Sequence, residues 1–307
     1  MLLLVGLALV VALGVAGGLA PRVAPQASVW ELRRTTEPRR TGVFRHPDLD
    51  ESSGVAASRR HPGVLWTLND SGHEALIFAT DTLGRDYGAF EVSGAENRDW
   101  EAIALGPCAA GDCLYIADTG DNARSRKRVT IYRVAEPAIP ARVRQTRQAE
   151  ALEIRYPRGR RDVEAAFVDT AGAVYLVSKG TPYAYRVPSD AWRAGETVTA
   201  EELPMLPIVS GSLGSQVTDA ALAPSGSLVA VRTYLAIYLF VLTAEGALAP
   251  TGVACDAAGL QLQGEGITWL DDRVLVLTSE GRFGSRGTIV LLECGDAAPA
   301  RDILPGP

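Results

Sequence analysis

The sequence has few of the residues that enzymes commonly use for proton transfer and nucleophilic attack. It contains only three histidines in 307 residues, His46, His61 and His73. No H-E-x-x-H pair, G-x-S-x-G turn or glycine-rich phosphate-binding loop is present. These absences exclude the common zinc-protease motif, the α/β-hydrolase nucleophile turn and the standard nucleotide-binding loops.

The chain also lacks long basic blocks and long amphipathic helical patterns. Its formal net charge is -6, with both signs of charge mixed along the sequence. A nucleic-acid surface is therefore disfavoured, and a small polar ligand or a protein is the better expectation for a partner. We expect the protein to be a monomer.

Charge is absent from residues 1–20, which are almost entirely apolar and are followed by Pro21 and Arg22. Such a segment is typical of an export signal, and small residues would allow cleavage after Ala20 or Ala27. It is also just long enough to remain as a membrane anchor, which would be the chain's contact with a membrane. Either outcome predicts export to the periplasm, to the medium or to an outward-facing membrane position. Residues 21–40 then read as a linker and residues 297–307 as a tail.

Four cysteines agree with export, because disulfides persist in oxidising compartments. Cys108 and Cys113 flank a predicted turn between two strands, so a disulfide there would staple a hairpin. Cys255 and Cys294 would form the second pair, although four cysteines allow three pairings. The C-x4-C spacing without nearby histidines is a poor match to a zinc site.

One phrase occurs five times in the sequence. An acidic or small polar residue opens a short apolar strand, a turn follows, and a second apolar strand ends in a charged residue. The copies run from Ser53 to Asp70, Glu101 to Asp118, Glu164 to Lys179, Asp219 to Arg232 and Glu265 to Glu280. Repeats of this length, built from short strands, indicate a propeller or a solenoid.

We therefore predict an all-β protein, a five-bladed β-propeller of four-stranded blades over residues 41–296. The fifth copy lacks its last strand, which an N-terminal strand at Ser28–Leu32 or Gly42–Arg45 would supply to close the ring. Six blades remain open if another unit lies within 134–161. A β-sandwich is the alternative fold, but it would not predict five copies of one phrase.

The phrase places its polar ends at one mouth of the central channel. In each blade the first strand lines the channel and the second runs antiparallel to it, so the start of one lies beside the end of the other. The inner set is Glu51 or Ser53, Glu101, Glu164, Asp219 and Glu265; the outer set is Asp70, Asp118, Lys179, Arg232 and Glu280. We expect these residues to bind a ligand or one another.

Carboxylates confined to one opening repel each other unless positive charge lies among them. Calcium and magnesium prefer oxygen ligands. The first two copies supply such oxygens from Asn69, Asp70, Glu101, Asp118, Asp121 and Asn122. In the alternative interpretation these are ordinary turn residues, and Lys179 and Arg232 neutralise the carboxylates.

Candidates for catalytic proton transfer are few. Asp118 is one, and His73 is the histidine nearest the expected mouth. As a general base His73 would need an orienting carboxylate, for which Glu74 or Asp70 is close in sequence. A surface role for His73 is the alternative.

At the phrases ESSGVAAS, LWTLNDSG, NRDWEAIALGP and LYIADTGDN, the chain resembles a group of exported bacterial β-propeller proteins that are mostly uncharacterised. More distantly, its strand starts are similar to those of phytase-like esterase, gluconolactonase and paraoxonase propellers. That resemblance implies a calcium or similar ion in the channel, with Glu101, Asp118, Asp121 and Asn122 as ligands. The five copies here, against six blades in those families, and the basic Lys179 and Arg232 depart from that pattern.

The sequence thus predicts an exported propeller that binds a divalent cation or a small polar ligand at an acidic mouth. One alternative is a metal-dependent phosphoester or lactone hydrolase. The other is a protein-interaction scaffold with a purely structural channel.

Overall fold

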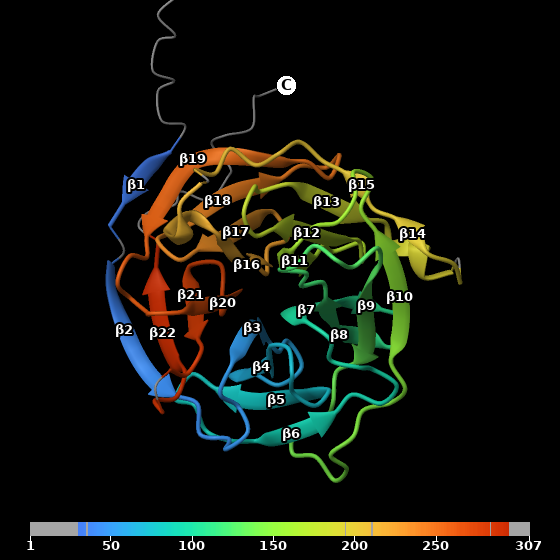
Figure 1. Ribbon diagram of the computed structural model, residues 1–307. Helices are drawn as coiled ribbons and strands as arrows, with labels where there is room; N and C mark the ends of the chain where they lie inside the picture. Colours follow the sequence, from blue (N-terminus) through green and yellow to red (C-terminus); the bar gives the residue numbers. More distant parts are fainter. Residues whose placement is uncertain (1–29, 35, 194, 210, 283, 295–307) are drawn as a thin grey trace, which may run out of the picture.

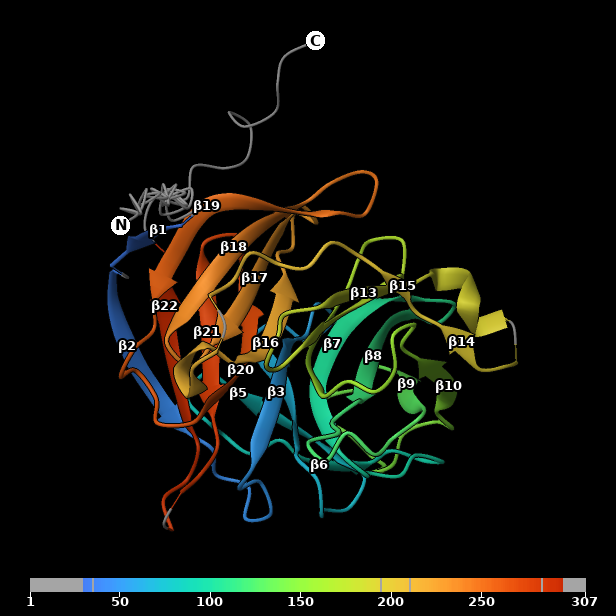
Figure 2. The same ribbon diagram turned by 45° about the horizontal axis from the view of Figure 1, so that its top comes forward.

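The computed structural model describes residues 30–34, 36–193, 195–209, 211–282 and 284–294. These residues form five sheets arranged as blades around one axis, so the predicted five-bladed β-propeller is confirmed (Figure 1). The blades are strongly twisted, as Figure 2 shows from a tilted direction. The segments 1–20 and 297–307, assigned to a signal or anchor and to a tail, lie outside the described residues.

Each blade is a meander of strands, and some blades gain a strand from elsewhere in the chain. The first blade contains β3 (Ser52–Ala57), β4 (Val64–Asn69), β5 (Leu76–Asp81) and β6 (Gly88–Glu91). The second contains β7 (Trp100–Cys108), β8 (Gly111–Asp118), β9 (Val129–Ala135), β10 (Glu150–Arg155) and, at its edge, β14 (Val198–Thr199). The third contains β11 (Val163–Val168), β12 (Val174–Ser178), β13 (Ala184–Val187) and β15 (Glu201–Glu202).

The last two blades both contain N-terminal strands. The fourth contains β16 (Val217–Leu222), β17 (Leu228–Thr233), β18 (Ala236–Leu242), β19 (Leu248–Asp256) and β1 (Glu31–Arg33). The fifth contains β20 (Gly264–Trp269), β21 (Val274–Ser279), β22 (Thr288–Glu293) and β2 (Thr36–Val43).

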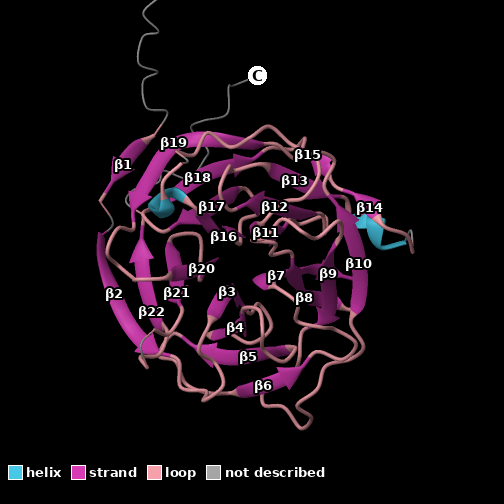
Figure 3. Ribbon diagram, viewed as in Figure 1, coloured by secondary structure: helices cyan, strands magenta, loops and turns pink. Residues whose placement is uncertain are grey.

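Two short 3-10 helices, η1 (Ser189–Arg193) and η2 (Leu213–Ser215), are the helices of the described residues (Figure 3). Within the described residues, no helix is long and apolar enough to span a membrane.

The ring closes through β2, which pairs antiparallel with β22. This confirms closure by an N-terminal strand, although the strand begins at Thr36, before the expected Gly42–Arg45. The other candidate, Ser28–Leu32, overlaps β1, which instead pairs in parallel with β19 of the fourth blade. Strands therefore begin at Glu31, within the segment assigned to a linker. The stretch 134–161 contains the end of β9, a long loop and β10, and no sixth blade.

The inner strands β3, β7, β11, β16 and β20 are buried on both faces, which explains their continuous rather than alternating apolar pattern. Small residues let them approach the axis closely. A Cβ atom on Gly54 of β3 would lie only 2.8 Å from the backbone nitrogen of Ile103 in β7. Between neighbouring blades lie five hydrophobic clusters, so the core is distributed around the ring.

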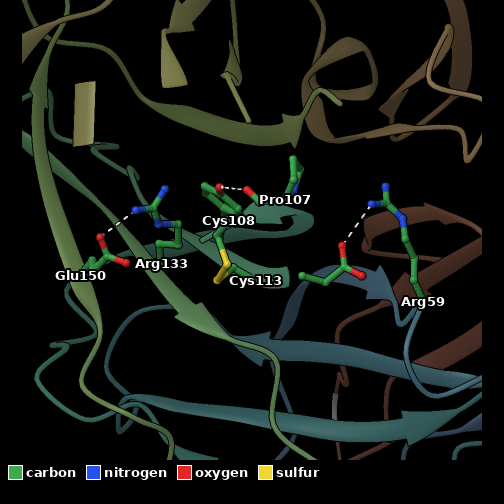
Figure 4. Close-up of a disulfide and its surroundings, with 8 residues drawn as sticks. Arg59, Pro107, Cys108, Cys113, Arg133 and Glu150 are labelled. Carbon is green, nitrogen blue, oxygen red and sulfur yellow. Dashed lines mark hydrogen bonds and ion pairs between the residues drawn. A yellow bond between two sulfur atoms is a disulfide. The ribbon is translucent and has the colours of Figure 1, made fainter. Parts of the chain in front are cut away.

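The structure pairs Cys108 with Cys113 and Cys255 with Cys294, the pairing favoured from the sequence. The first disulfide joins the two ends of the β7–β8 turn, near the Arg133–Glu150 ion pair of the same blade (Figure 4). The second joins the fourth blade to the residue that follows β22 in the fifth. Two disulfides agree with an oxidising compartment outside the cytoplasm.

We expect the two disulfides to contribute unequally to stability. The Cys255–Cys294 bond spans 39 positions and the Cys108–Cys113 bond only 5, and a longer loop loses more freedom in the unfolded chain when it is closed. Replacing Cys255 and Cys294 by alanine should lower the free energy of unfolding by about 2–4 kcal/mol, and the Cys108/Cys113 pair should cost less. Urea unfolding of both double variants tests this, and the reverse order would contradict it.

Candidate metal site at the channel mouth

The inner strands place four acidic side chains in buried positions around one end of the channel. They are Glu101, Glu164, Asp219 and Glu265, each at most 5% exposed. Ser53 holds the fifth position and is 3% exposed. The inner set predicted from the repeat is therefore buried at the mouth, with Ser53 rather than the exposed Glu51 in the first blade.

Two groups of carboxylates meet at Glu101. Asp70, Asp99 and Glu101 each bring one oxygen within 4.8 Å of the others. Glu101, Asp162 and Glu164 do the same. An ion that contacts each oxygen at about 2.3–2.6 Å fits within such a spacing. Glu101 thus lies between two positions that could each hold a metal ion.

Asp99 and Asp162 were missed in the sequence analysis, yet the sequence carries a signal for both. Each precedes an inner-strand glutamate by two residues, in Asp99-Trp-Glu101 and Asp162-Val-Glu164. Both aspartates lie just before their strands, and a β-bulge at each glutamate interrupts the regular alternation of side chains. The D-x-E pattern at the entry of the second and third blades contributes two carboxylates from each copy to these groups.

Gly120 lets the loop after β8 approach this group closely. A Cβ atom there would lie 2.3 Å from Glu101 Oε1 and 2.5 Å from Asp99 Oδ2. The amide of Gly120 also donates to the carbonyl of Asp99 (3.1 Å). On the other side, the Ser53 hydroxyl donates to Glu101 Oε2 (3.2 Å). Glu101 is thus oriented by neighbours on both sides, and a side chain at position 120 would displace the Glu101 and Asp99 carboxylates.

Lys179 neutralises one of the two groups. Its Nζ lies 2.6 Å from Glu164 Oε1. Burial by itself would lower the pKa of Lys179, but the adjacent Glu164 carboxylate outweighs burial and raises it. Among the described residues, no comparable ion pair is made by Asp70, Asp99 or Glu101. The carboxylates of Asp70, Asp99 and Glu101 therefore remain available to a cation.

The crowding of carboxylates changes their acidity. Burial, followed by repulsion from Asp70 and Asp162, raises the pKa of Asp99 to about 6. Burial and repulsion from Glu265 and Asp70 raise the pKa of Glu280 to about 7. Burial and repulsion from Glu164 also raise the pKa of Glu101. Burial is the largest cause of all three shifts and repulsion between carboxylates adds to it, and a bound cation would offset that repulsion.

Asp118 and Asp121 hold the neighbouring loop. Asp118 Oδ1 lies 2.8 Å from Arg126 Nη1 and accepts the amide of Asp99 (3.1 Å). Asp121 accepts the amides of Ser125 (2.6 Å) and Arg126 (2.9 Å). Both are buried, and neither belongs to the two carboxylate groups. Asp118 thus positions the backbone that carries Asp99.

Of the remaining metal candidates, one belongs to a carboxylate group and two do not. Asp70 belongs to the first group. The side chain of Asn69 instead braces a loop, because its Oδ1 accepts the amide of Glu51 and its Nδ2 donates to the carbonyl of Asp48. Asn122 is exposed on the loop after β8.

Of the predicted ligand-binding residues, Asp219 and Arg232 connect the fourth and fifth blades. Asp219 accepts the amides of Ala220 and Ile267 (2.8 and 2.9 Å). Arg232 is 1% exposed and donates to the carbonyls of Gly266 and Thr278 (2.6 and 2.9 Å). These hydrogen bonds occupy both side chains in holding the ring together.

Glu265 and Glu280 remain at the mouth in the fifth blade. Glu265 accepts a hydrogen bond from the Tyr234 hydroxyl (2.9 Å) and Glu280 accepts one from Gln263 Nε2 (2.6 Å). Together with Lys179 and Glu164, they extend the polar lining beyond the two carboxylate groups.

His73 lies beside carboxylates other than the two expected. Its Nε2 is 3.2 Å from Asp50 Oδ1, and its Nδ1 is 3.6 Å from Glu51 Oε2. Asp50 and Glu51, on the segment that enters β3, take the orienting position predicted for Glu74 or Asp70. His73 shares a short loop with Asp70, which places an imidazole near the first carboxylate group.

Comparison with known proteins supports the fold. No protein-family model and no curated protein matches the chain. A PQQ-bound aldose sugar dehydrogenase from Streptomyces coelicolor is 15% identical, with a TM-score of 0.50 over 83% of this chain and 96% of that one. A gluconolactonase from Xanthomonas campestris is 14% identical, with a TM-score of 0.44 over 85% of this chain and 98% of that one.

A virginiamycin B lyase from Staphylococcus aureus is also 14% identical, with a TM-score of 0.43 over 81% of this chain and 69% of that one. By name these three proteins are enzymes with different activities. The distant similarity of the sugar dehydrogenase to the present chain, with a TM-score of 0.50, supports the β-propeller fold alone.

Asp99 should make the metal-free protein less stable as the pH rises. Its pKa is about 6 in the folded state against 3.8 ordinarily, so the folded state holds the proton more tightly. Between about pH 4 and pH 6 the unfolded chain has lost this proton and the folded state has not, and stability falls through that window. Asp99→Asn should remove this contribution, on the order of 1 kcal/mol after solvent screening.

The measurement is the melting temperature of wild type and Asp99→Asn in chelator at steps between pH 4 and pH 8. The difference between the two proteins should move in favour of the variant as the pH rises. An Asp86→Asn variant, at an exposed loop position, serves as a control. A pH-independent difference between wild type and Asp99→Asn would contradict the prediction.

Proposed function

We propose that this protein is an exported β-propeller that binds one divalent cation, Ca²⁺ foremost, at its channel mouth. The observation that carries the proposal is the convergence of the Asp70, Asp99 and Glu101 oxygens within 4.8 Å of one another. Three carboxylates without a basic partner match the preference of calcium for charged oxygen ligands. The apolar segment 1–20 and the two disulfides support export.

The first carboxylate group is the better ion site of the two. In the second group, the Lys179 ammonium already lies 2.6 Å from Glu164 and would repel a metal ion. Within the described residues, no ion pair is made by the carboxylates of the Asp70 group, and the repulsion that adds to burial in raising the pKa of Asp99 favours occupation. We therefore expect one ion per chain, with Lys179 taking the place of a second.

The resemblance to exported bacterial propellers, carried by phrases such as NRDWEAIALGP and LYIADTGDN, agrees with this proposal. We infer that the chain belongs to that group. Within the second phrase, Asp118 and Asp121 would support the site by positioning Asp99 and Gly120 rather than by contacting the ion.

Glu101→Gln should weaken Ca²⁺ binding by about tenfold or more, because it removes the carboxylate common to both groups. Isothermal titration calorimetry of chelator-treated protein measures the affinity and the stoichiometry, which we expect to be one. Calcium at 100 times its Kd should raise the stability of the wild type by about 2.7 kcal/mol.

Asp81→Asn is the matched control for this experiment. It removes a buried carboxylate at the end of β5 that accepts the amides of Leu83 and Arg85 and lies outside both groups, so it should lower stability and leave the calcium affinity within about threefold of wild type. The proposal fails if the wild type binds no divalent cation, or if Glu101→Gln binds calcium as tightly as wild type does.

A second candidate function is metal-dependent hydrolysis of a phosphoester or lactone. It is favoured by the position of His73, with Asp50 3.2 Å from its Nε2, on the loop that also carries Asp70. An imidazole held by a carboxylate can accept a proton from water next to a metal ion.

His73→Ala should then lower kcat for such a substrate about 100-fold or more while calcium affinity stays unchanged. Assays with a panel of phosphodiesters and lactones, in the presence of calcium and of chelator, test this. His61→Ala, a histidine on the β3–β4 loop away from the mouth, is the control. If no panel member is turned over, a binding or scaffold role at the same mouth is favoured.

A further inference from the structure

Trp30 fastens the start of the described chain to the loop that follows β15. Its indole Nε1 donates to the carbonyl of Pro207 (2.6 Å), and its ring contacts Tyr238 and Phe240 edge-on, with centroid distances of 5.0 and 5.1 Å. Trp30 also packs against the cluster between the third and fourth blades. Two segments 177 residues apart are therefore held together at this point of the surface.

Exposed apolar side chains flank both ends of that hydrogen bond. Leu32, two residues beyond Trp30, is 62% exposed, whereas Met205 and Val209, two residues on either side of Pro207, are 55% and 67% exposed. Leu32, Met205 and Val209, with Trp30 between them, are called the N-terminal patch. Large apolar side chains gathered at an exposed place usually mark an interaction surface.

Positive charge accompanies the patch. The segment 31–40 contains four arginines against two glutamates, although the chain as a whole has a net charge of -6. Arg34, Arg39 and Arg40 are exposed. One arginine, Arg33, forms an ion pair with Glu31 (3.6 Å). A local excess of arginine beside exposed apolar side chains is complementary to an anionic lipid surface.

The sequence before the N-terminal patch also favours a lipid bilayer as the partner. Residues 1–29 come before Trp30, and residues 1–20 are uncharged and long enough to cross a bilayer. The nine residues 21–29 can span at most about 30 Å. Any membrane that holds the first segment, permanently or during export, therefore lies within reach of the patch. Tryptophan is also enriched where a membrane meets water.

We propose that the N-terminal patch rests on the surface of a lipid bilayer, with Leu32, Met205 and Val209 inserted among the head groups and Arg34, Arg39 and Arg40 facing anionic lipid. Because β1 lies on the circumference of the ring (Figure 1), the propeller would contact the membrane by its edge. The mouth would then stay open to solvent. This inference does not depend on the proposed metal site.

Quenching of tryptophan fluorescence by brominated lipids tests the contact with the full chain. The protein is mixed with vesicles of phosphatidylcholine and phosphatidylglycerol, with and without bromine on the acyl chains. The difference between wild type and Trp30→Phe isolates Trp30, because the other four tryptophans are present in both proteins; Trp66, Trp100 and Trp269 are buried and Trp192 is half-buried on η1. We expect Trp30 to be quenched, and Leu32→Asp/Val209→Asp to remove at least about half of that quenching.

Leu262→Asp is the matched control, since Leu262 is 88% exposed but lies between β19 and β20, away from the patch in sequence. It should leave the quenching unchanged. In vesicles of phosphatidylcholine alone, quenching should fall, and Arg39→Gln/Arg40→Gln should produce a similar fall in mixed vesicles. Thermal melting verifies that each variant is folded.

The proposal is overturned if Trp30 is not quenched, or if Leu32→Asp/Val209→Asp is quenched as strongly as wild type. It is also overturned if light scattering shows a dimer that this double variant dissociates, because the patch would then bind a second copy of the chain.

Discussion

The structure depends on one constraint, the closure of the ring by β2 against β22. Without it, β22 would expose an unpaired edge and the fifth blade would lack its outer strand. Closure also fixes where the first blade lies relative to the fifth, and a separate hydrophobic cluster fills that interface. The inner strands then converge on one axis, so the polar side chains at their ends are held close together. The arrangement of carboxylates at the channel mouth follows from this closeness.

Proximity explains why the two halves of the mouth differ. In the fourth blade, Asp219 accepts its own blade's Ala220 amide and the Ile267 amide of the fifth blade, and Arg232 donates to two carbonyls of the fifth blade. This half of the mouth is therefore held by hydrogen bonds. In the second and third blades, Asp99, Glu101, Asp162 and Glu164 meet one ammonium, that of Lys179. Asp219 lies one residue beyond the position of Glu101 and Glu164, because Thr218 occupies the bulge in β16 that those glutamates occupy in β7 and β11. The fourth blade thus carries a structural connection where the second and third blades carry unbalanced charge.

Much of this fold could be read from the sequence because the relevant signals are local. Five copies of one phrase gave the number of blades, and the missing strand of the last copy required an N-terminal partner. The identity of that partner was less certain, because Thr36–Val43 contains a proline and three charged side chains that resemble a linker. Edge strands tolerate such residues, since one side of the strand makes no backbone hydrogen bonds within the sheet.

The site was harder to predict because its members are joined across blades. Asp70 and Glu101 were candidates from the sequence and belong to the carboxylate groups, and Asp99 and Asp162 could have been found from the repeated D-x-E pattern. In contrast, nothing local to Asp118 or Asp121 reveals that Arg126 and the following amides occupy them. Oxygen-rich loops look alike in a sequence whether they bind an ion or cap their own backbone. The partners distinguish them, and those partners follow from the fold.

The outer edges of the ring carry a different consequence. The edge of the second blade is covered by β14, from the segment that follows η1, and the edge of the fourth by β1. On the first blade, Gln145 of the β9–β10 loop forms a parallel bridge to Glu91 in β6. Each of these three blades is thus overlapped by chain that belongs to another part of the sequence. Such overlaps protect strands from pairing with other molecules, and they couple neighbouring blades so that one cannot open without disturbing the next.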